Sequence, residues 1–268
     1  MKLKYMYCIC LNNALLPYVK KLNYIPVGLG NENFSDEWLK DSTQENISYK
    51  NKYYSEYTFH YWFWKNMIDK IEDDEWIGFC AYRRFWKQDL ESKNDSIYNM
   101  ALHKIPDEWS NYDTIIGDKL DLSCVKWTKV FKYGKISFLR NPLAIFKNKR
   151  SIRFHFDMFH GNGVLDKAAD LLDEKDKKDF KEFIKINNSY NQGNMFICKS
   201  KKIIKDYYKT LFEWLLRCEE IFGFDLQGYG QTRIYAFLAE RFLPYWFNKY
   251  TKPLEWPIRF YDLRSETK

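Results

Sequence analysis

Two adjacent arginines, Arg83 and Arg84, stand directly after an apolar run and a tyrosine, Tyr82. The run, WIGFC at residues 76–80, predicts a buried strand that ends just before them. An arginine side chain offers a planar fork of N–H donors that suits the oxygens of a diphosphate. Two arginines at the end of a strand can equally form ordinary ion pairs with surface carboxylates. The residues alone leave both interpretations open.

A carboxylate and a histidine, Glu56 and His60, are four residues apart in a stretch that is rich in aromatic residues. Residues at this spacing share one face of a helix. Glu56 could therefore contact a hydroxyl of a ligand or an arginine of the site. The structural alternative is a buried carboxylate that pairs with Arg83 or Arg84, and both interpretations stay open.

Three polar residues, Asn46, Ser48 and Asn51, precede this stretch at the place where a helix is expected to begin. Backbone amides at a helix start favour anions, so these residues could help to bind a phosphate group. For Ser48, simple N-capping explains the residue without any ligand, and capping is the interpretation that we favour.

Two groups of residues could in principle hold a metal ion. His155 and His160 flank Asp157 in the sequence RFHFDMFHGNG, but their spacing matches no strong metal motif and favours a substrate-side loop or a structural turn. Asp118 and Asp121 are spaced wrongly for a metal pair and read better as a solvated turn. The six cysteines show no CxxC spacing, which indicates a reduced protein without a zinc knuckle.

The elements that would position these residues alternate along the chain. Strands are expected at residues 3–10, 76–80, 114–117 and 195–198, and helices at about 48–71, 165–186, 201–221 and 231–247. Strands separated by helices predict a single α/β domain with a mostly parallel central sheet flanked by helices. In such sheets the ligand binds outside the carboxyl ends of the strands, where Arg83 and Arg84 would emerge.

The composition narrows the classes of partner. The formal net charge of +7 favours anionic partners, but no motif indicates a nucleic-acid-binding protein. No apolar run is long enough to span a membrane, so we expect a cytoplasmic protein. The C-terminal stretch FLPYWFNKYTKPLEWPIRFY mixes aromatic and basic residues, which suits peripheral contact with the inner face of the cell membrane. Packing of this stretch in the core is the interpretation that we favour.

Several motifs together resemble a known family. They are YIPVGLG at 24–30, ENISYKN at 45–51, YSEYTFHYWFWKN at 54–66, IGFCAYRRFW at 77–86, NMFICKS at 194–200 and TRIYAFLAERFL at 232–243. Their order and types resemble a bacterial glycosyltransferase-like family of capsular and O-antigen polysaccharide gene clusters, long catalogued as a domain of unknown function. The motifs span nearly the whole chain, and their joint occurrence is far more specific than any one of them.

The resemblance implies a GT-A-like fold and a hexosyltransferase-like enzyme. The donor would be a nucleotide-sugar, most simply a UDP-sugar with galactose in its pyranose or furanose form, and the acceptor a capsular or undecaprenyl-diphosphate-linked glycan. Residues 1–120 would form the donor-binding half and residues 121–268 the acceptor half. Related enzymes often hold Mg²⁺ or Mn²⁺ through an Asp-x-Asp motif. Here Tyr82-Arg83-Arg84 takes that place, which implies arginine assistance with the metal optional.

The resemblance also implies roles for residues outside the arginine pair. Lys65 of the YWFWKN motif would join the donor site, and Asn194 and Arg233 would line the acceptor side with His160. Transfer with inversion needs one carboxylate that takes the acceptor's proton. Candidates for this base are Glu240, Asp225 and Asp157, and no sequence argument separates them.

One position departs from the family pattern. The family has a histidine before Tyr-Arg-Arg, where this chain has Ala81. If the family uses that histidine in chemistry, this chain acts without it. The alternative function is therefore a non-catalytic glycan- or nucleotide-binding protein that descends from such an enzyme.

Overall fold

The computed structural model describes residues 3–30, 32–90, 96–134 and 136–267. Within this range the chain forms two compact units. Unit 1 comprises residues 1–118, 193–208 and 247–268, and unit 2 comprises residues 119–192 and 209–246. Each unit thus draws on separate stretches of the sequence, whereas the halves expected above are continuous. The expectation of one domain with two functional halves stays a prediction.

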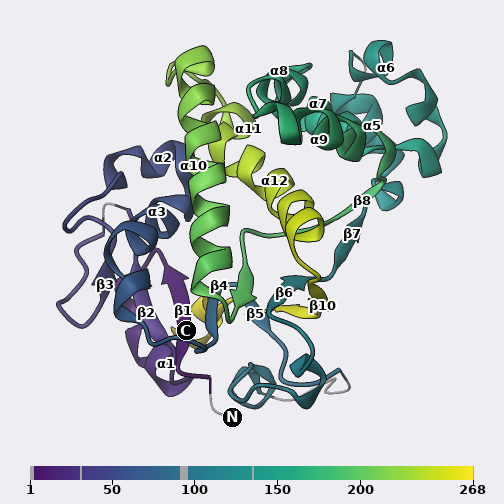
Figure 1. Cartoon of the computed structure of the whole chain (residues 1–268). Helices are drawn as coiled ribbons and strands as arrows, with labels where there is room; N and C mark the ends of the chain where they lie inside the picture. Colours follow the sequence, from purple (N-terminus) through teal and green to yellow (C-terminus); the bar gives the residue numbers. More distant parts are fainter. Residues whose placement is uncertain (1–2, 31, 91–95, 135, 268) are drawn as a thin grey trace. The chain divides into compact units, whose positions relative to one another are not determined.

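The central sheet lies in unit 1 (Figure 1). Its strands are β1 (Tyr5–Cys10), β2 (Ile25–Gly28), β3 (Leu39–Lys40), β4 (Ile77–Ala81), β5 (Arg84–Trp86), β6 (Thr114–Gly117), β9 (Phe196–Cys198), β10 (Leu254–Trp256) and β11 (Ile258–Phe260). The order is β10-β6-β9-β4-β1-β2-β3, and β5 pairs with β4 and β11. Strand β1 is parallel to β2 and β4, β2 to β3, and β6 to β10, whereas β9 is antiparallel to β4 and β6. The α/β class with a mostly parallel central sheet is therefore confirmed.

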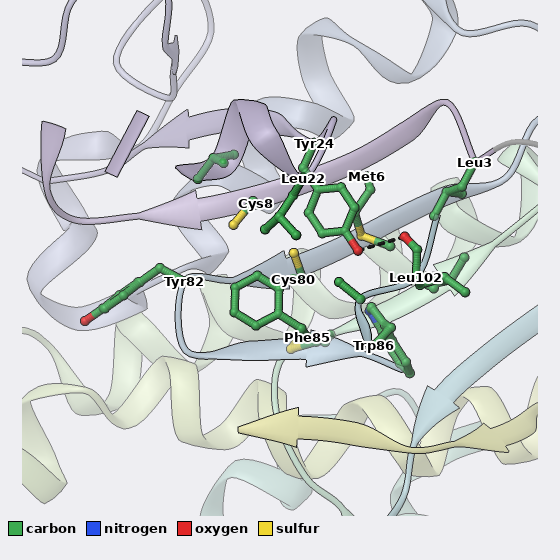
Figure 2. Packing of buried hydrophobic residues seen from close by; sticks show 14 of the residues in the cluster. Leu3, Met6, Cys8, Leu22, Tyr24, Cys80, Tyr82, Phe85, Trp86 and Leu102 are labelled. Carbon is green, nitrogen blue, oxygen red and sulfur yellow. Dashed lines mark hydrogen bonds between the residues drawn. The ribbon is translucent and has the colours of Figure 1, made fainter. Parts of the chain in front are cut away.

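One face of this sheet carries an apolar cluster (Figure 2). Alternate residues of β1, Met6 and Cys8, join Cys80 of β4 and Leu22, which follows helix α1 (Leu16–Lys21). The cysteines here are free and buried, as expected of small apolar residues. Figure 2 shows Tyr82 at the end of the cluster, where β4 turns back into β5. Burial of this face thus fixes the position of the turn.

The other face of the sheet packs against aromatic side chains. Tyr7 of β1 contacts Phe63 of α3 (Tyr57–Asn66), with ring centroids 5.1 Å apart. Phe79 of β4 lies 5.0 Å from Phe196 of β9, which lies 5.0 Å from Phe247. Such ring pairs contribute beyond their buried area. The alternation of small and aromatic residues along β1 therefore places α1 and α3 on opposite faces of the sheet.

The helix expected at residues 48–71 is broken. The structure has a 3₁₀ helix at Ser48–Lys50, helix α2 at Asn51–Tyr54, helix α3, and a 3₁₀ helix at Ile68–Lys70. Ser55, between α2 and α3, has a φ of 53° and a ψ of −132°, which no helix can contain. The apolar periodicity continues across Ser55, so the sequence pattern gave no sign of the break.

The remaining elements of unit 1 are short, and unit 2 is mainly helical. Unit 1 adds α4 (Ile97–Met100) and 3₁₀ helices at 13–15, 107–109 and 263–267. Unit 2 has α5 (Trp127–Tyr133), α6 (Ser137–Arg140), α7 (Ile152–His160), α8 (Val164–Asp170), α9 (Glu174–Ile186), α11 (Tyr229–Thr232), the paired strands β7 (Lys119–Asp121) and β8 (Ser189–Asn191), and 3₁₀ helices at 122–124, 142–145 and 147–149. Two helices cross between the units along the chain, α10 (Lys201–Phe222) and α12 (Ile234–Tyr250).

Three expectations for these segments need correction. The helix expected at 165–186 is two helices, α8 and α9. The segment RFHFDMFHGNG is not a loop, because residues 152–160 form α7 with Ser151 as its side-chain N-cap. The last helix starts at Ile234, not near 231, because residues 229–232 form the separate short helix α11, which ends before Arg233 with its φ of −94° and ψ of 27°.

The aromatic C-terminal stretch packs in the core. Phe242, Leu243, Tyr245, Trp246 and Phe247 are all buried. Core packing, the interpretation that we favoured, is therefore confirmed for this part of the stretch. In the ranges that the structure describes, no helix is both long and apolar enough to span a membrane.

Candidate functional site

The two arginines belong to a tight hairpin at the carboxyl end of β4. Ala81, the last residue of β4, pairs with Arg84, the first residue of β5, so Tyr82 and Arg83 form a two-residue turn. The Tyr82 amide donates to the Ile9 carbonyl of β1 at 3.0 Å, and the Tyr82 carbonyl accepts from the Leu263 amide at 3.0 Å. The buried strand β4 therefore ends in two arginines because the chain reverses its direction at Tyr82 and Arg83.

Neither arginine forms an ion pair with any residue that the structure describes. The exposed Arg83 lies over the Tyr82 ring, 5.1 Å from its centroid, and helps to lower the pKa of Asp262, after a larger effect of Arg264. Arg84 is half-buried. Ordinary surface pairing therefore does not account for either residue. A half-buried guanidinium without a counter-charge is the local electrostatic condition for binding an anion.

Gly193 lies beside the Arg84 guanidinium, and Asn194 and Glu56 are linked to Gly193 by the chain and by a hydrogen bond. A Cβ on Gly193 would lie 3.7 Å from Nη1 of Arg84, so the backbone before β9 passes close to the guanidinium. The next residue, Asn194, donates from its side-chain amide to Oε1 of Glu56 at 2.9 Å. Oδ1 of Asn194 is buried and has no hydrogen-bond partner among the described residues. We call Glu56, Arg84, Gly193 and Asn194 the Arg84 cluster.

The Arg84 cluster lies at the carboxyl edge of the parallel strands. Strand β9 runs antiparallel to β4 with Gly78 opposite Ile197, so the residues that precede β9 lie near the end of β4. This is the edge at which α/β sheets bind ligands. Sequence reasoning named Glu56, Arg84 and Asn194 separately, and the structure brings the three together. The structural alternative, in which Glu56 pairs with Arg83 or Arg84, is not found. Glu56 accepts a hydrogen bond from Asn194, and neither arginine forms an ion pair in the described residues.

His60 supports this cluster from within the core. Its Nε2 lies 3.3 Å from the Asn194 carbonyl, and its Nδ1 lies 2.7 Å from the Tyr208 hydroxyl. A carbonyl can only accept, so Nε2 carries the proton and Nδ1 accepts from Tyr208. Burial lowers the pKa of His60 to about 4. A neutral, fully bonded histidine positions Asn194 and has no spare nitrogen for a ligand.

The residues expected at the helix start have structural roles. The Asn46 carboxamide oxygen accepts from the amide and the hydroxyl of Ser48, at 3.1 and 2.8 Å. The expectation that Ser48 is the N-cap is wrong, since its hydroxyl donates to Asn46 and caps no amide. Asn51 donates to the Ser55 carbonyl and the Thr58 hydroxyl across the break between α2 and α3.

Lys65 also serves the local fold. It pairs with Glu45 at 3.3 Å and lies over the Trp64 ring, 4.2 Å from its centroid. Asn66 of the same motif donates to the Glu45 carbonyl at 2.8 Å. The two motifs ENISYKN and YTFHYWFWKN therefore hold each other in place. Their contacts explain the residue pattern without a ligand.

The predicted residues of α12 and its surroundings make separate contacts. Arg233 lies before α12 and donates to the Tyr229 hydroxyl at 3.2 Å. Glu240 pairs with the buried Arg241, its neighbour in the sequence. Asp225 is exposed in the segment between α10 and α11.

Asp157 and His160 are held by the fold of unit 2. Oδ1 of Asp157 accepts from the Gly163 amide at 2.9 Å, and its Oδ2 accepts from Asn141 at 3.2 Å. His160 lies 3.0 Å from the Gly230 carbonyl and stacks on Phe237, with ring centroids 3.9 Å apart. Burial lowers the pKa of His160 to about 2, so the ring is neutral at physiological pH. The contacts of both residues are structural.

The described residues contain no group of three or more His, Cys, Asp or Glu side chains placed to hold a metal ion. Asp121 accepts from the Ser123 amide and hydroxyl at 2.8 and 2.7 Å, as an N-cap does. Burial raises the pKa of Asp118, which opposes its charged form. These contacts do not fit the Asp-x-Asp chemistry of a metal site, and we derive no step through a metal ion.

One buried carboxylate, Asp41, escaped the sequence analysis. It follows β3 directly, at the same carboxyl edge as the Arg84 cluster, and is only 2% exposed. Its Oδ2 has no hydrogen-bond partner in the described part of the chain, and burial raises its pKa to about 6. Asp41 stands in a polar, turn-rich stretch of the sequence, where acidic residues are ordinary, so no signal marked it.

Comparison with solved structures finds the same fold in part of a larger enzyme. The structure titled WbbM bifunctional glycosyltransferase, in its apo form, matches with a TM-score of 0.65 and 21% sequence identity. The match covers 96% of this chain and 45% of that chain, so this chain spans less than half of that protein. The likeness shows that this chain shares its α/β fold with part of that protein, and the GT-A-like type stays a prediction. A search of curated proteins found no significant match.

A protein-family model matches most of the chain. The model is described as Domain of unknown function (DUF4422), and it matches residues 6–252. This range includes nearly all of β1, the strands β2 to β9, the Arg84 cluster and all of unit 2. The chain therefore belongs to the DUF4422 family.

Proposed function

We propose that this chain is a glycosyltransferase that moves a sugar from a nucleotide diphosphate donor to a glycan acceptor, with the donor diphosphate at the Arg84 cluster. The half-buried guanidinium of Arg84, which lacks an ion pair among the described residues, carries this proposal. Support comes from its place at the carboxyl edge and from the fold shared with part of a glycosyltransferase.

The chemistry of transfer explains why a cation is useful there. The bond between the sugar's anomeric carbon and the diphosphate oxygen breaks, and the acceptor oxygen forms the new bond. Negative charge grows on the departing diphosphate, and fixed N–H donors of Arg84 stabilise it. The acceptor hydroxyl gives its proton to a carboxylate, the role predicted for Asp225, Glu240 or Asp157.

The other members of the Arg84 cluster supply shape and polarity. Gly193 has a φ of +89° and no side chain, which leaves space beside the guanidinium. The unpartnered Oδ1 of Asn194 can accept from a sugar hydroxyl. Glu56 accepts from the Asn194 side-chain amide and so holds Asn194 in place. We propose that these two residues contact the donor sugar.

The finer identity of the substrates rests on the family resemblance. We propose a UDP-sugar donor, with galactose in its pyranose or furanose form, and a capsular or undecaprenyl-diphosphate-linked acceptor at the inner face of the cell membrane. Mg²⁺ or Mn²⁺ is a variable to test, since the described residues fit no such site.

A donor scan tests the proposal. The purified protein is incubated with UDP-, GDP- and CMP-sugars and a lipid-linked acceptor, with and without a chelator, and products are identified by mass spectrometry. We expect transfer from a UDP-sugar. Absence of transfer, together with no thermal stabilisation by UDP, GDP or CMP, would contradict the proposal.

Ala81 favours a second candidate, a nucleotide- or glycan-binding protein without turnover. The backbone of Ala81 pairs with Arg84, so a histidine at position 81 would stand next to the arginine on the same face of the sheet. Its absence removes a group from the neighbourhood of the diphosphate. Thermal stabilisation by UDP without any transfer in the donor scan would support this candidate.

A further inference from the structure

Basic residues are concentrated in one segment of unit 2. Residues 122–156 contain six lysines and three arginines but no aspartate or glutamate. The whole chain has a formal net charge of only +7, so the rest of the chain is slightly acidic. Such segregation creates a local positive field that attracts anionic surfaces.

The lysines of this segment that the structure describes form no ion pairs, in contrast to many lysines elsewhere. Lys126, Lys129, Lys132, Lys147 and Lys149 are exposed, and none forms an ion pair with a residue in the described ranges. Outside the segment, lysines repeatedly pair with carboxylates, as at positions 4, 20, 40, 65, 177, 181, 201, 202 and 205. The positive charge of the segment therefore stays available for a partner.

Large apolar side chains are exposed among these lysines. Leu139 is 84% exposed, and Tyr133, Ile136, Leu143, Ile145 and Phe146 are exposed as well. They lie on α5, α6 and the 3₁₀ helices at 142–145 and 147–149, or directly beside them. Six large apolar side chains are thus exposed between positions 133 and 146, and such a concentration, unlike single scattered ones, indicates a site of interaction. We call residues 126–134 and 136–149 the basic apolar segment.

The basic apolar segment is anchored to the rest of unit 2. Arg150 is buried, donates to the carbonyls of Val125 and Ala144, and lies over the Trp127 ring. Arg153 donates to Asn141. Figure 1 shows the short helices α5 and α6 beside α7. The exposed side chains are thus carried on a backbone that is fixed at both ends.

We propose that the basic apolar segment docks on a bilayer of anionic phospholipids. Free lysines match the negative surface, and Leu, Ile and Phe side chains can enter the region between headgroups and acyl chains. Exposed aliphatic side chains such as Leu139 distinguish this surface from one for nucleic acids, which are bound by basic and stacking groups. The inference does not depend on the proposed activity, and it places the contact elsewhere than the C-terminal stretch considered in the sequence analysis.

Vesicle flotation tests the inference on the full chain. We expect the protein to float with vesicles of phosphatidylcholine and phosphatidylglycerol, but not with phosphatidylcholine alone, and to be released by salt. Each lysine near an anionic surface strengthens binding roughly five-fold, so replacing Lys129, Lys132 and Lys147 by Gln should weaken it about 100-fold. Replacing Leu139, Leu143 and Phe146 by Ser should weaken it about ten-fold or more.

Matched controls lie in the same unit. Lys175→Gln, Lys178→Gln and Lys185→Gln remove the same charge from α9, and Ile186→Ser, Leu216→Ser and Ile221→Ser remove exposed apolar residues elsewhere. We expect both control sets to float like the unmodified protein. Thermal unfolding of every variant checks that the fold is kept.

Three outcomes would overturn the inference. The first is no flotation with phosphatidylglycerol vesicles. The second is flotation that the apolar substitutions leave unchanged, because contact by charge alone would fit any polyanion. The third is a concentration-dependent dimer, seen by sedimentation, that the apolar substitutions abolish while vesicles are not bound. In that case a second copy of the chain covers the surface.

Discussion

Replacing Arg84 separates a ligand-binding role from a structural one. In the described part of the chain Arg84 makes no ion pair, so Arg84→Ala should change the free energy of unfolding by less than about 1 kcal/mol. Hydrogen bonds to a charged partner contribute about 1.5–3 kcal/mol, so the same substitution should weaken UDP binding by about 10- to 150-fold. Arg84→Lys keeps the charge but loses the planar fork, and we expect an intermediate loss.

The assay is isothermal titration with UDP, paired with urea unfolding of each variant. Arg259→Ala is the matched control. Arg259 is exposed on β11 opposite Phe85, and residues directly opposite share a face, so it points away from the face of Arg84. We expect Arg259→Ala to bind UDP like the unmodified protein.

Two results would contradict a ligand-binding role for Arg84. If Arg84→Ala and Arg259→Ala bind UDP equally well, the diphosphate does not lie at Arg84. If Arg84→Ala instead lowers the free energy of unfolding by several kcal/mol, the guanidinium is part of the folded framework and not a vacant binding group.

Three further predictions concern stability, measured by urea unfolding. Burial raises the pKa of Asp41 from an ordinary 3.8 to about 6, so its contribution to the free energy of unfolding is complete below pH 3.8 and is lost as the pH rises through 6. Relative to Asp41→Asn, the unmodified protein should therefore lose about 3 kcal/mol of stability between pH 4 and pH 8. The same pH dependence of stability in both proteins would contradict this prediction. Gly28→Ala would place a Cβ 2.5 Å from the Phe34 ring and should lower the free energy of unfolding by about 1–3 kcal/mol. An unchanged free energy of unfolding would argue against the close contact. Ser55→Gly should stabilise the protein by about 1 kcal/mol, because glycine adopts a φ of 53° without strain, and destabilisation would show that the Ser55 side chain matters more than its backbone.

The sequence predicted the strands better than the helix boundaries. The runs at residues 3–10, 76–80, 114–117 and 195–198 are strands in the structure, because apolar β-formers bounded by turn residues admit few alternatives. The break at Ser55 and the division of α8 from α9 escaped prediction. A single residue of unusual backbone conformation leaves the apolar period on either side intact.

Only part of the site could be predicted, because its residues come from parts of the chain that are far apart in the sequence. Arg84 could be placed from the sequence, because it follows a strand whose carboxyl end faces the ligand edge. Its neighbours Asn194 and Glu56 come from distant parts of the chain, and their hydrogen bond depends on the antiparallel insertion of β9 beside β4. Sequence order does not reveal that pairing. Asp41 shows the opposite problem, since burial and not residue type makes it unusual.

Motif residues around α3 illustrate a further limit. Asn46, Ser48, Asn51 and Lys65 belong to a strong sequence pattern, and the pattern was interpreted as a donor site. In the structure their side chains join the loop before α2 to α3 through hydrogen bonds and an ion pair. These contacts give the four residues a local structural role, and their part in donor binding stays a prediction.

A crystal structure of the protein with UDP would show whether Arg84 binds the donor diphosphate. We predict an oxygen of the diphosphate within hydrogen-bonding distance of the Arg84 guanidinium, at the carboxyl end of β4. A nucleotide bound elsewhere, with the Arg84 side chain still facing solvent, would contradict it.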